Sequence, residues 1–224
     1  MHAAGATLPR TGWLADTPPD FRDLVLHACD VLCFKTTERI YEDGDNAGGI
    51  FGVVAGGLEV HLPWRGSRST LSHIGGPGFW TGAGTAITGA PRRVTIAARA
   101  SSCLLRLPRA AVVEITRNDP STHVYFSALN ARNLFLAIDI VNALKCTDAL
   151  ERVTATLLNL VGCDSAKQPV IHASQSDLAS IAGLGHSSVS VAVTNLERRG
   201  WLRRRYAAIE ITDLTALQRS VEIT

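Results

Sequence analysis

Five arginines gather near the C-terminal end of the sequence, at positions 198, 199, 203, 204 and 205. Clustered guanidinium groups are a common means of binding the phosphates of a nucleic-acid backbone. A run of charge by itself is more often a solvated surface. The residues that precede the cluster decide between these interpretations, because DNA binding also needs an element that enters a groove.

The segment before the arginines has the pattern of two short helices. Ser174 stands three residues before Asp177, which is the spacing of a helix capping box. Gly183 marks a turn, and a second helix is expected from His186 to a C-cap glycine at Gly200. Two short helices joined by a Gly-containing turn are typical of a helix-turn-helix.

Residues 201–206 and 209–211 are expected to form the two strands of a wing after this pair of helices. The sequence therefore predicts a winged helix-turn-helix that binds double-stranded DNA. The candidate DNA-contacting residues come from both helices, the turn and the wing: Ser174, Gln175, Gly185, His186, Ser187, Ser188, Ser190, Val191, Thr194, Arg203, Arg204 and Arg205.

The N-terminal half has a different pattern, with short apolar segments separated by glycine-rich turns. Strands are expected over residues 50–54, 58–62, 69–74, 94–98 and 103–107. Many short strands at this spacing indicate an antiparallel β-roll of the jelly-roll type.

A long helix is expected between the two halves, over residues 121–144, which contain no glycine or proline. Apolar residues alternate at spacings of three and four, as in a helix that pairs with another helix. This seam predicts a homodimer, although a helix packed inside one monomer is the alternative. The seam residues are Phe126, Leu129, Asn133, Leu136, Ile140 and Ala143, and a second stripe contains Leu134, Ile138, Val141 and Leu144.

The charge balance and the apolar segments indicate where the protein works and which partners it has. Lys and Arg exceed Asp and Glu by only 22 to 20, and no uninterrupted apolar run is long enough to span a membrane. The first residues lack the pattern of a signal peptide, so we expect a cytoplasmic protein without a membrane partner. Its five cysteines are then expected to be reduced thiols, with a redox or metal site at Cys29 and Cys33 as the alternative.

These features together resemble the Crp/Fnr family of bacterial transcription regulators. The matching motifs, in order, are Gly44-Asp45, Gly56-Gly57, Pro91-Arg92, Asn118-Asp119-Pro120, the run 175–179 and the run 195–202. The resemblance implies an α+β protein with a β-roll sensor domain in residues 1–120. It also implies a dimerisation helix and hinge in 121–147 and a winged helix-turn-helix in 148–224. A homodimer would read a near-palindromic promoter site, with RNA polymerase as a candidate partner.

The sensor domain departs from the members of the family that bind cyclic nucleotides. Those members carry a ribose-binding glutamate where this sequence has Gly82 or Ala83, and a small hydroxyl residue where Arg93 follows Arg92. Their long helix offers hydroxyls to the purine, where this chain has Ala137 and Ile138. Missing hydrogen-bond partners argue against cyclic AMP as the effector.

Two further effectors known in the family are an iron–sulfur cluster and haem. A four-cysteine iron–sulfur cluster lacks its ligand set, since only Cys29 and Cys33 lie near the N-terminal region. Haem stays open, with His61 and His73 as candidate axial ligands. The resemblance is equally compatible with an effector-independent regulator that has a vestigial pocket, and with a protein-interaction adaptor that kept the fold. No enzyme motif stands out.

The second helix of the helix-turn-helix also departs from the family. Where members that read G-rich half-sites place Arg, Glu and Arg, this sequence has His186, Ser187 and Val191. Val191 can touch a thymine methyl, and the remaining two can make single hydrogen bonds. We therefore expect a different half-site, with more of the affinity drawn from phosphate contacts.

Overall fold

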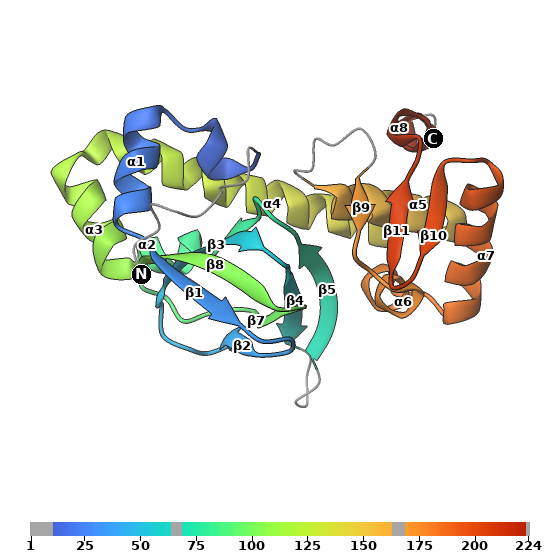
Figure 1. Cartoon of the computed structure of the whole chain (residues 1–224), viewed down its shortest axis with the longest axis horizontal. Coiled ribbons are helices and arrows are strands. Elements are labelled where there is room, and N and C mark those ends of the chain that lie inside the picture. Colours follow the sequence, from blue (N-terminus) through green and yellow to red (C-terminus); the bar gives the residue numbers. More distant parts are fainter. Residues whose placement is uncertain (1–10, 64–68, 163–168, 223–224) are drawn as a thin grey trace. The chain divides into compact units, whose positions relative to one another are not determined.

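The structure is a computed structural model that describes residues 11–63, 69–162 and 169–222. Contacts divide the chain into two compact units. The first unit contains residues up to Ser69 together with Ile74–Leu134, and the second contains Thr70–His73 and the residues from Phe135 onward. Figure 1 shows the β-strands and their covering helices in the first half, and helices around a small sheet in the second.

The predicted β-roll is present as two four-stranded antiparallel sheets. One has the order β1-β8-β3-β6 and the other the order β2-β7-β4-β5. The first sheet consists of β1 (Asp30–Phe34), β8 (Ser102–Pro108), β3 (Gly49–Ala55) and β6 (Trp80–Thr81), and the second of β2 (Arg39–Tyr41), β7 (Thr95–Ala98), β4 (Leu58–Pro63) and β5 (Ser69–Gly75).

Alternation along the strands divides the core of the roll into two clusters. On β3, Ile50 belongs to a cluster beneath the helices and Phe51 to a cluster between the sheets. Leu105 and Leu104 of β8 divide in the same way, because successive side chains of a strand point to opposite faces. Both faces of the central strands are therefore buried.

Several helices that the sequence analysis did not anticipate cover the first cluster. They are the 3-10 helix η2 (Trp13–Asp16), α1 (Pro19–His27), α2 (Ala83–Thr88), α3 (Arg109–Asn118) and the 3-10 turn η3 (Pro120–Thr122). Trp13 packs edge-on against Trp80, with ring centroids 5.3 Å apart, and Phe21 lies 4.5 Å from Tyr125. The segment before β1 is thus part of the core of the roll.

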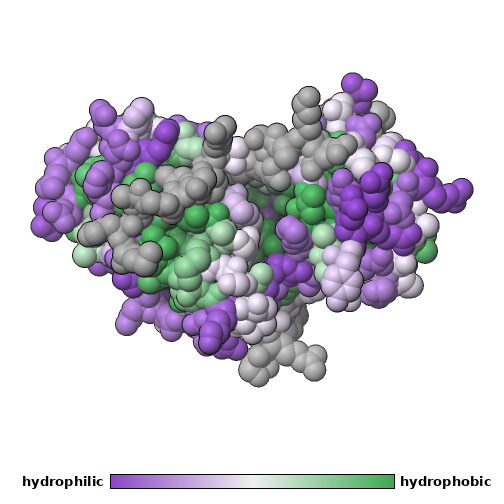
Figure 2. Space-filling model, viewed as in Figure 1, coloured by the Kyte–Doolittle hydropathy of each residue, from purple (hydrophilic) through white to green (hydrophobic). Residues whose placement is uncertain are grey.

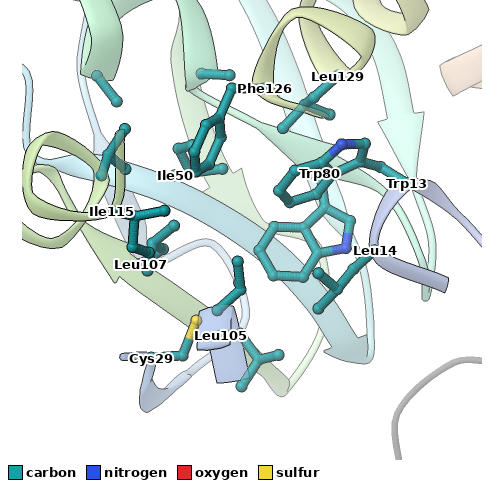
Figure 3. Packing of buried hydrophobic residues seen from close by; sticks show 14 of the residues in the cluster. Trp13, Leu14, Cys29, Ile50, Trp80, Leu105, Leu107, Ile115, Phe126 and Leu129 are labelled. Atoms are coloured by element: carbon teal, nitrogen blue, oxygen red, sulfur yellow. The ribbon is translucent and has the colours of Figure 1, made fainter. Parts of the chain in front are cut away.

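The long helix α4 (His123–Lys145) follows η3 directly, close to its predicted bounds. Phe126 and Leu129 point from α4 into the same cluster as Trp13, Trp80 and Ile50 (Figure 3). The indole nitrogen of Trp13 donates to the Tyr125 carbonyl at 2.6 Å, and Arg132 pairs with Asp16 at 2.5 Å. By length and composition alone, residues 120–145 could also cross a membrane, but one face of the helix is committed to this core.

The second unit has the elements of the predicted winged helix-turn-helix, with two additions. Its elements are α5 (Ala149–Val161), β9 (Val170–Ile171), α6 (Gln175–Ala182), α7 (His186–Arg198), β10 (Leu202–Arg205), β11 (Ala208–Ile211) and α8 (Leu214–Glu222). The strands form one antiparallel sheet of order β10-β11-β9. Both β9 and α8 were missed in the sequence.

The expectation of reduced thiols is wrong for two of the cysteines. Cys33 and Cys103 form a disulfide between β1 and β8, where they face each other in the antiparallel register. Cys29 is a buried free thiol and Cys146 a half-buried one, whereas Cys163 lies outside the described residues. Cys29, four residues before Cys33, instead packs into the first core cluster.

Candidate nucleic-acid interface and sensor pocket

The first helix of the helix-turn-helix begins at the predicted capping box. The Ser174 hydroxyl accepts from the Asp177 amide at 3.1 Å, and an Asp177 carboxylate oxygen accepts from the Ser174 amide at 2.7 Å. Gly183, in the left-handed conformation with φ of 60°, ends α6. The Ser174 hydroxyl also donates to Asp177. Ser174 therefore fixes the start of α6, and its contact with DNA stays a prediction.

The second helix, α7, has one buried face and one exposed face. Val189, Val193 and Leu196 are fully buried, while Val191 is 71% exposed. The exposed face carries Ser187, Val191, Asn195 and Arg198, with His186 at the first turn. A short polar face with one exposed valine is suited to reading base edges and thymine methyl groups in a major groove.

The wing is a hairpin of β10 and β11 joined by the two residues Tyr206 and Ala207. Ala207 has a positive φ of 48°, and Tyr206 is fully exposed at the tip. Hydrophilic residues crowd the surface of the unit that carries α7 and this wing (Figure 2). Sequence reasoning missed Tyr206 and Asn195 as surface candidates, although the spacing of 191, 195 and 198 places Asn195 on one helix face with Val191 and Arg198.

The three wing arginines each have a carboxylate partner. Arg204 pairs with Glu197 of α7 at 2.5 Å, and Arg205 pairs with Glu210 at 2.7 Å. Arg203 lies 3.9 Å from the same Glu210 carboxylate. The backbone amide and guanidinium of Arg204 lower the pKa of Glu197, so this carboxylate stays ionised. The positive charge of the wing is therefore partly compensated, and Arg198 is exposed beside it.

The candidate effector pocket is built around Arg92, which is only 2% exposed. One guanidinium nitrogen donates to the Thr85 hydroxyl at 2.7 Å and the other to the Gly49 carbonyl at 2.7 Å. The guanidinium also lies 4.1 Å from the centre of the Tyr41 ring. Arg92 is thus held by the protein itself, and an anion placed here would compete with these partners.

The neighbouring pocket positions leave little room for the nucleotide contacts of the family. A Cβ atom on Gly82 would lie 2.6 Å from an Arg92 nitrogen, so a glutamate cannot occupy position 82 without moving Arg92. Ala83 is buried and Arg93 is exposed. Ala137 and Ile138 are exposed on the part of α4 that belongs to the second unit. These positions do not provide the polar partners that the resemblance led us to look for.

The two candidate haem ligands have different surroundings. A ring nitrogen of His61 lies 3.1 Å from a Glu59 carboxylate oxygen. Burial lowers the pKa of His73 to about 4, so its imidazole is neutral at neutral pH. Within residues 11–63, 69–162 and 169–222, no three or more His, Cys, Asp or Glu side chains group as a metal site.

The predicted dimer seam needs correction. Phe126, Leu129 and Ala143 are buried in the chain's own core, and Asn133, Leu136 and Ile140 are half-buried. The three buried residues are not available to a partner chain, and the half-buried ones stay a prediction. The exposed apolar residues of α4 are instead Val124, Leu134, Phe135, Ile138, Val141 and Leu144, which include the second stripe.

A β-roll, a long helix and a winged helix-turn-helix in one chain define the class of DNA-binding regulators with an N-terminal sensor-type domain. Models of the cyclic nucleotide-binding domain and of the Crp-like helix-turn-helix domain match residues 31–119 and 151–220. The chain belongs to the Crp/Fnr family of transcription regulators. No curated protein sequence matches it.

Solved structures share this architecture. FixK2 from Bradyrhizobium japonicum is 21% identical with a TM-score of 0.74, covering 85% of this chain and 96% of that one. The c-di-GMP responsive global regulator CLP from Xanthomonas campestris is 16% identical with a TM-score of 0.66, covering 87% and 99%. A CRP/FNR family regulator from Thermus thermophilus is 20% identical with a TM-score of 0.63, covering 86% and 98%. At these identities the likeness shows the fold alone.

Proposed function

We propose that this protein is a cytoplasmic, homodimeric transcription regulator that binds a near-palindromic DNA site. The proposal rests on the two faces of α7. Its apolar residues are buried, while its polar residues and Val191 are exposed beside a wing. A helix with this division in a helix-turn-helix is suited to the major groove. Two such helices in a dimer read half-sites about 34–36 Å apart.

The dimer is assigned to the exposed face of α4. Positions 124, 128, 131, 135, 138, 142 and 145 alternate at spacings of four and three, which is the spacing of a coiled-coil seam. Val124, Phe135 and Ile138 supply large apolar groups to this seam, and all three are exposed in the single chain. Asn142 and Lys145 would add two polar positions at the end of the seam, which can fix the register. A second copy of the same helix is therefore the partner that this face fits.

The contacts with DNA follow from the exposed residues of α7 and the wing. Val191 is positioned for a thymine methyl, and His186 and Ser187 for single hydrogen bonds to base edges. Gln175, Ser188, Ser190, Thr194 and the amide at Gly185 are assigned to phosphates, together with Arg198 and the wing arginines. Glu197 and Glu210 form ion pairs with three of these arginines. When a phosphate binds, each ion pair must break, or the guanidinium must contact the carboxylate and the phosphate together.

The Arg92 site favours a regulator that does not respond to a nucleotide in this pocket. The two terminal nitrogens of Arg92 are bonded to Thr85 and Gly49, its Nε is buried without a partner among the described residues, and a side chain at position 82 would collide with the guanidinium. The bonded nitrogens and the collision at position 82 support a vestigial pocket over cyclic AMP control. RNA polymerase is the partner expected at a promoter, and a supershift of the protein–DNA complex with the polymerase would test it.

A mobility-shift titration with a matched pair of variants tests DNA binding. Val191→Glu places a negative charge on the exposed face of α7, and Leu24→Glu makes the same change on exposed α1. We expect Val191→Glu to lose at least about tenfold in affinity for a promoter fragment, as expected when a base contact is replaced by phosphate repulsion, and Leu24→Glu to bind as the parent does.

A salt series on the parent protein separates a regulator from an adaptor. Binding that uses phosphates must weaken as salt rises, with a slope of about −0.9 per phosphate contact on a log–log plot. A slope near zero on every upstream fragment, with both glutamate variants equal to the parent, would support a protein-interaction adaptor instead.

A further inference from the structure

We propose that Cys33 and Cys103 form a reversible thiol–disulfide site, and that its oxidation state regulates the DNA affinity of the protein. The inference rests on the proposed function, since it adds a signal to a DNA-binding regulator. The site lies in the β-roll, where the two terminal nitrogens of Arg92 are bonded to Thr85 and Gly49.

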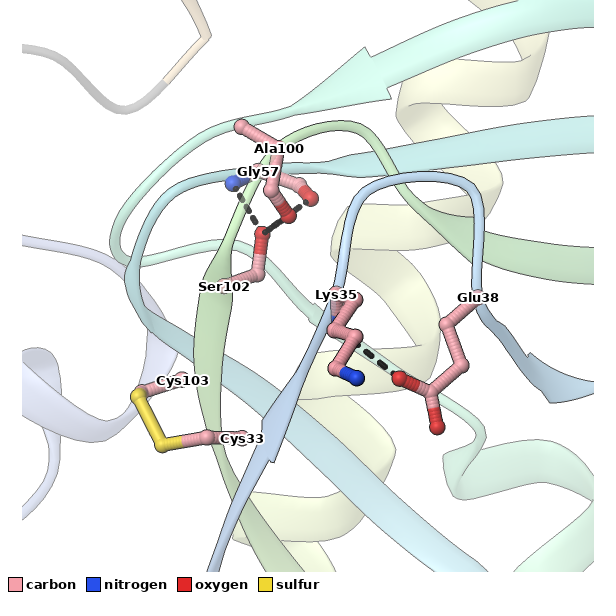
Figure 4. The surroundings of a disulfide bond; sticks show 7 residues. All are labelled: Cys33, Lys35, Glu38, Gly57, Ala100, Ser102 and Cys103. Carbon is pink, nitrogen blue, oxygen red and sulfur yellow. Dashed lines mark hydrogen bonds between the residues drawn. A yellow bond between two sulfur atoms is a disulfide. The ribbon is translucent and has the colours of Figure 1, made fainter.

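The two cysteines are placed for a bond that needs no rearrangement of the sheet. They are direct neighbours in the antiparallel ladder of β1 and β8, with Cα atoms 4.1 Å apart (Figure 4). Cys33 is exposed and Cys103 is half-buried. A solvent reagent can therefore reach the pair, and the backbone ladder holds the two sulfur atoms together in either oxidation state.

The compartment makes a permanent disulfide unexpected. A protein that binds chromosomal DNA works where thiols are kept reduced, and disulfides found there are usually transient, catalytic or redox-sensing. A disulfide between two facing cysteines that solvent can reach is therefore better explained in such a protein as a reversible, regulatory bond than as a permanent structural one.

Cys29, four residues before Cys33, does not compete for this chemistry. It is buried in the first core cluster, and burial raises its pKa to about 12. Its thiol stays protonated at neutral pH and cannot attack the disulfide, because the thiolate is the nucleophile. Cys29 therefore takes no part in exchange at the Cys33–Cys103 pair.

The reaction balances with a small disulfide such as oxidised glutathione as the oxidant. The Cys33 thiol loses its proton, and the thiolate attacks one glutathione sulfur, releasing one glutathione thiolate and leaving a mixed disulfide. The Cys103 thiolate, after losing its own proton, then attacks the Cys33 sulfur and releases the second glutathione thiolate. Two electrons pass to glutathione, and reduced glutathione reverses both steps.

Strand β1 is the element that the bond controls. It lies at the edge of its sheet, with β8 as its one strand neighbour. Without the disulfide, β1 is held by its backbone ladder, by the partly exposed Asp30–Arg106 ion pair at its other end, 2.6 Å long, and by the packing of Val31, Leu32 and Phe34 against the two core clusters. An edge strand has a backbone ladder on one side only, so reduction, which removes a covalent link, lowers the free energy needed to release β1.

The release of β1 reaches α4 through the helix that precedes it. Helix α1 leads into β1, and its Phe21 stacks against Tyr125 and Phe126 of α4 at 4.5 and 5.5 Å. On the other side of the bond, the hydroxyl of Ser102, next to Cys103, accepts from the Gly57 amide at 3.0 Å and donates to the Gly57 carbonyl (Figure 4). Strand β8 is thus anchored, and the mobile partner of the bond is β1.

The test equilibrates the full-length protein with a series of ratios of reduced to oxidised glutathione. Trapped free thiols are counted by mass after alkylation, and the DNA affinity is measured at each ratio. The variant Cys33→Ser with Cys103→Ser mimics the reduced state, and Cys146→Ser is the control at an unrelated thiol. Thermal unfolding confirms that each variant is folded.

We expect the pair to pass from disulfide to dithiol within the series, with a change of about fivefold or more in DNA affinity, which is the usual lower range of coupling between two sites. The double serine variant should stay at the reduced value at every ratio, and Cys146→Ser should follow the parent. A pair that stays oxidised throughout, or equal affinities in both states, overturns the inference while leaving DNA binding intact. Absence of DNA binding in both states would instead refute the proposed function.

Discussion

Two phenylalanines of α4 provide a direct test of the assignment of its faces. Phe126 is fully buried in the first core cluster, and Phe135, nine residues later, is 61% exposed. If the exposed face forms the dimer, Phe135→Ala separates the chains without unfolding them. Phe126→Ala destabilises the β-roll, because it leaves a cavity among Trp13, Trp80 and Ile50.

The size of each effect follows from burial. Burying a whole Phe side chain is worth about 1.5–3 kcal/mol, so covering the exposed 61% contributes about 1–2 kcal/mol per chain and about 2–4 kcal/mol per dimer. At about 1.4 kcal/mol per factor of ten, Phe135→Ala raises the dimer Kd by about one to three orders of magnitude. Phe126→Ala lowers the free energy of unfolding by about 3–5 kcal/mol.

Sedimentation equilibrium over a dilution series measures the dimer Kd, and urea unfolding at a concentration well above that Kd measures stability. Working at high concentration matters because the stability of a dimer depends on its concentration. The reverse pattern, with Phe126→Ala monomeric yet stable and Phe135→Ala dimeric, would refute the assignment and restore the seam that the sequence spacing favours.

Three further outcomes follow from buried or paired charges. Arg92→Met leaves the Gly49 carbonyl without its donor and lowers the free energy of urea unfolding by about 1–3 kcal/mol; unchanged stability with a loss of DNA binding would instead mark Arg92 as an effector anchor. Glu197→Gln frees Arg204 for a phosphate, so the salt slope of DNA binding steepens by up to about 0.9; an unchanged slope would mean that Arg204 does not reach DNA. The pKa of His73 is about 4 when folded and 6.5 in the reference state. The unfolded chain therefore binds the extra proton first, and stability to urea falls as the pH drops from 6.5 towards 4. In the variant His73→Gln, the free energy of unfolding should change less between pH 6.5 and pH 4. An equal change in the parent and the variant would contradict this prediction.

The sequence was most informative where local chemistry alone decides the structure. The capping box at Ser174 and Asp177 places the start of α6, and the glycines at 183 and 200 mark the ends of two helices. Each of these signals acts within a few residues, so no knowledge of distant contacts is needed. The wing was predicted for the same reason, since its two strands are adjacent in sequence.

The face of α4 that meets the core could not be determined from periodicity. Phe126 and Phe135 both lie on apolar stripes with alternating three- and four-residue spacings. Which stripe is buried depends on Trp13, Phe21 and Trp80, which are distant in sequence and belong to elements with no marked pattern of their own. The same distance hid the disulfide, because 70 residues separate Cys33 from Cys103 and only the strand register brings them together.

The two sensor features point to the same conclusion about where a signal enters. A ligand that uses the terminal nitrogens of Arg92 must displace their bonds to Thr85 and Gly49, so its binding free energy is reduced by that amount. A thiol reagent at Cys33 exchanges one disulfide for another, because it breaks the bond to Cys103 as it forms its own, and the exposed side chain is open to it. The cysteine pair is therefore the site at which a reagent binds at the lower free-energy cost. It includes strand β1, which contacts the start of α4 through α1, and α4 is the helix assigned to the dimer.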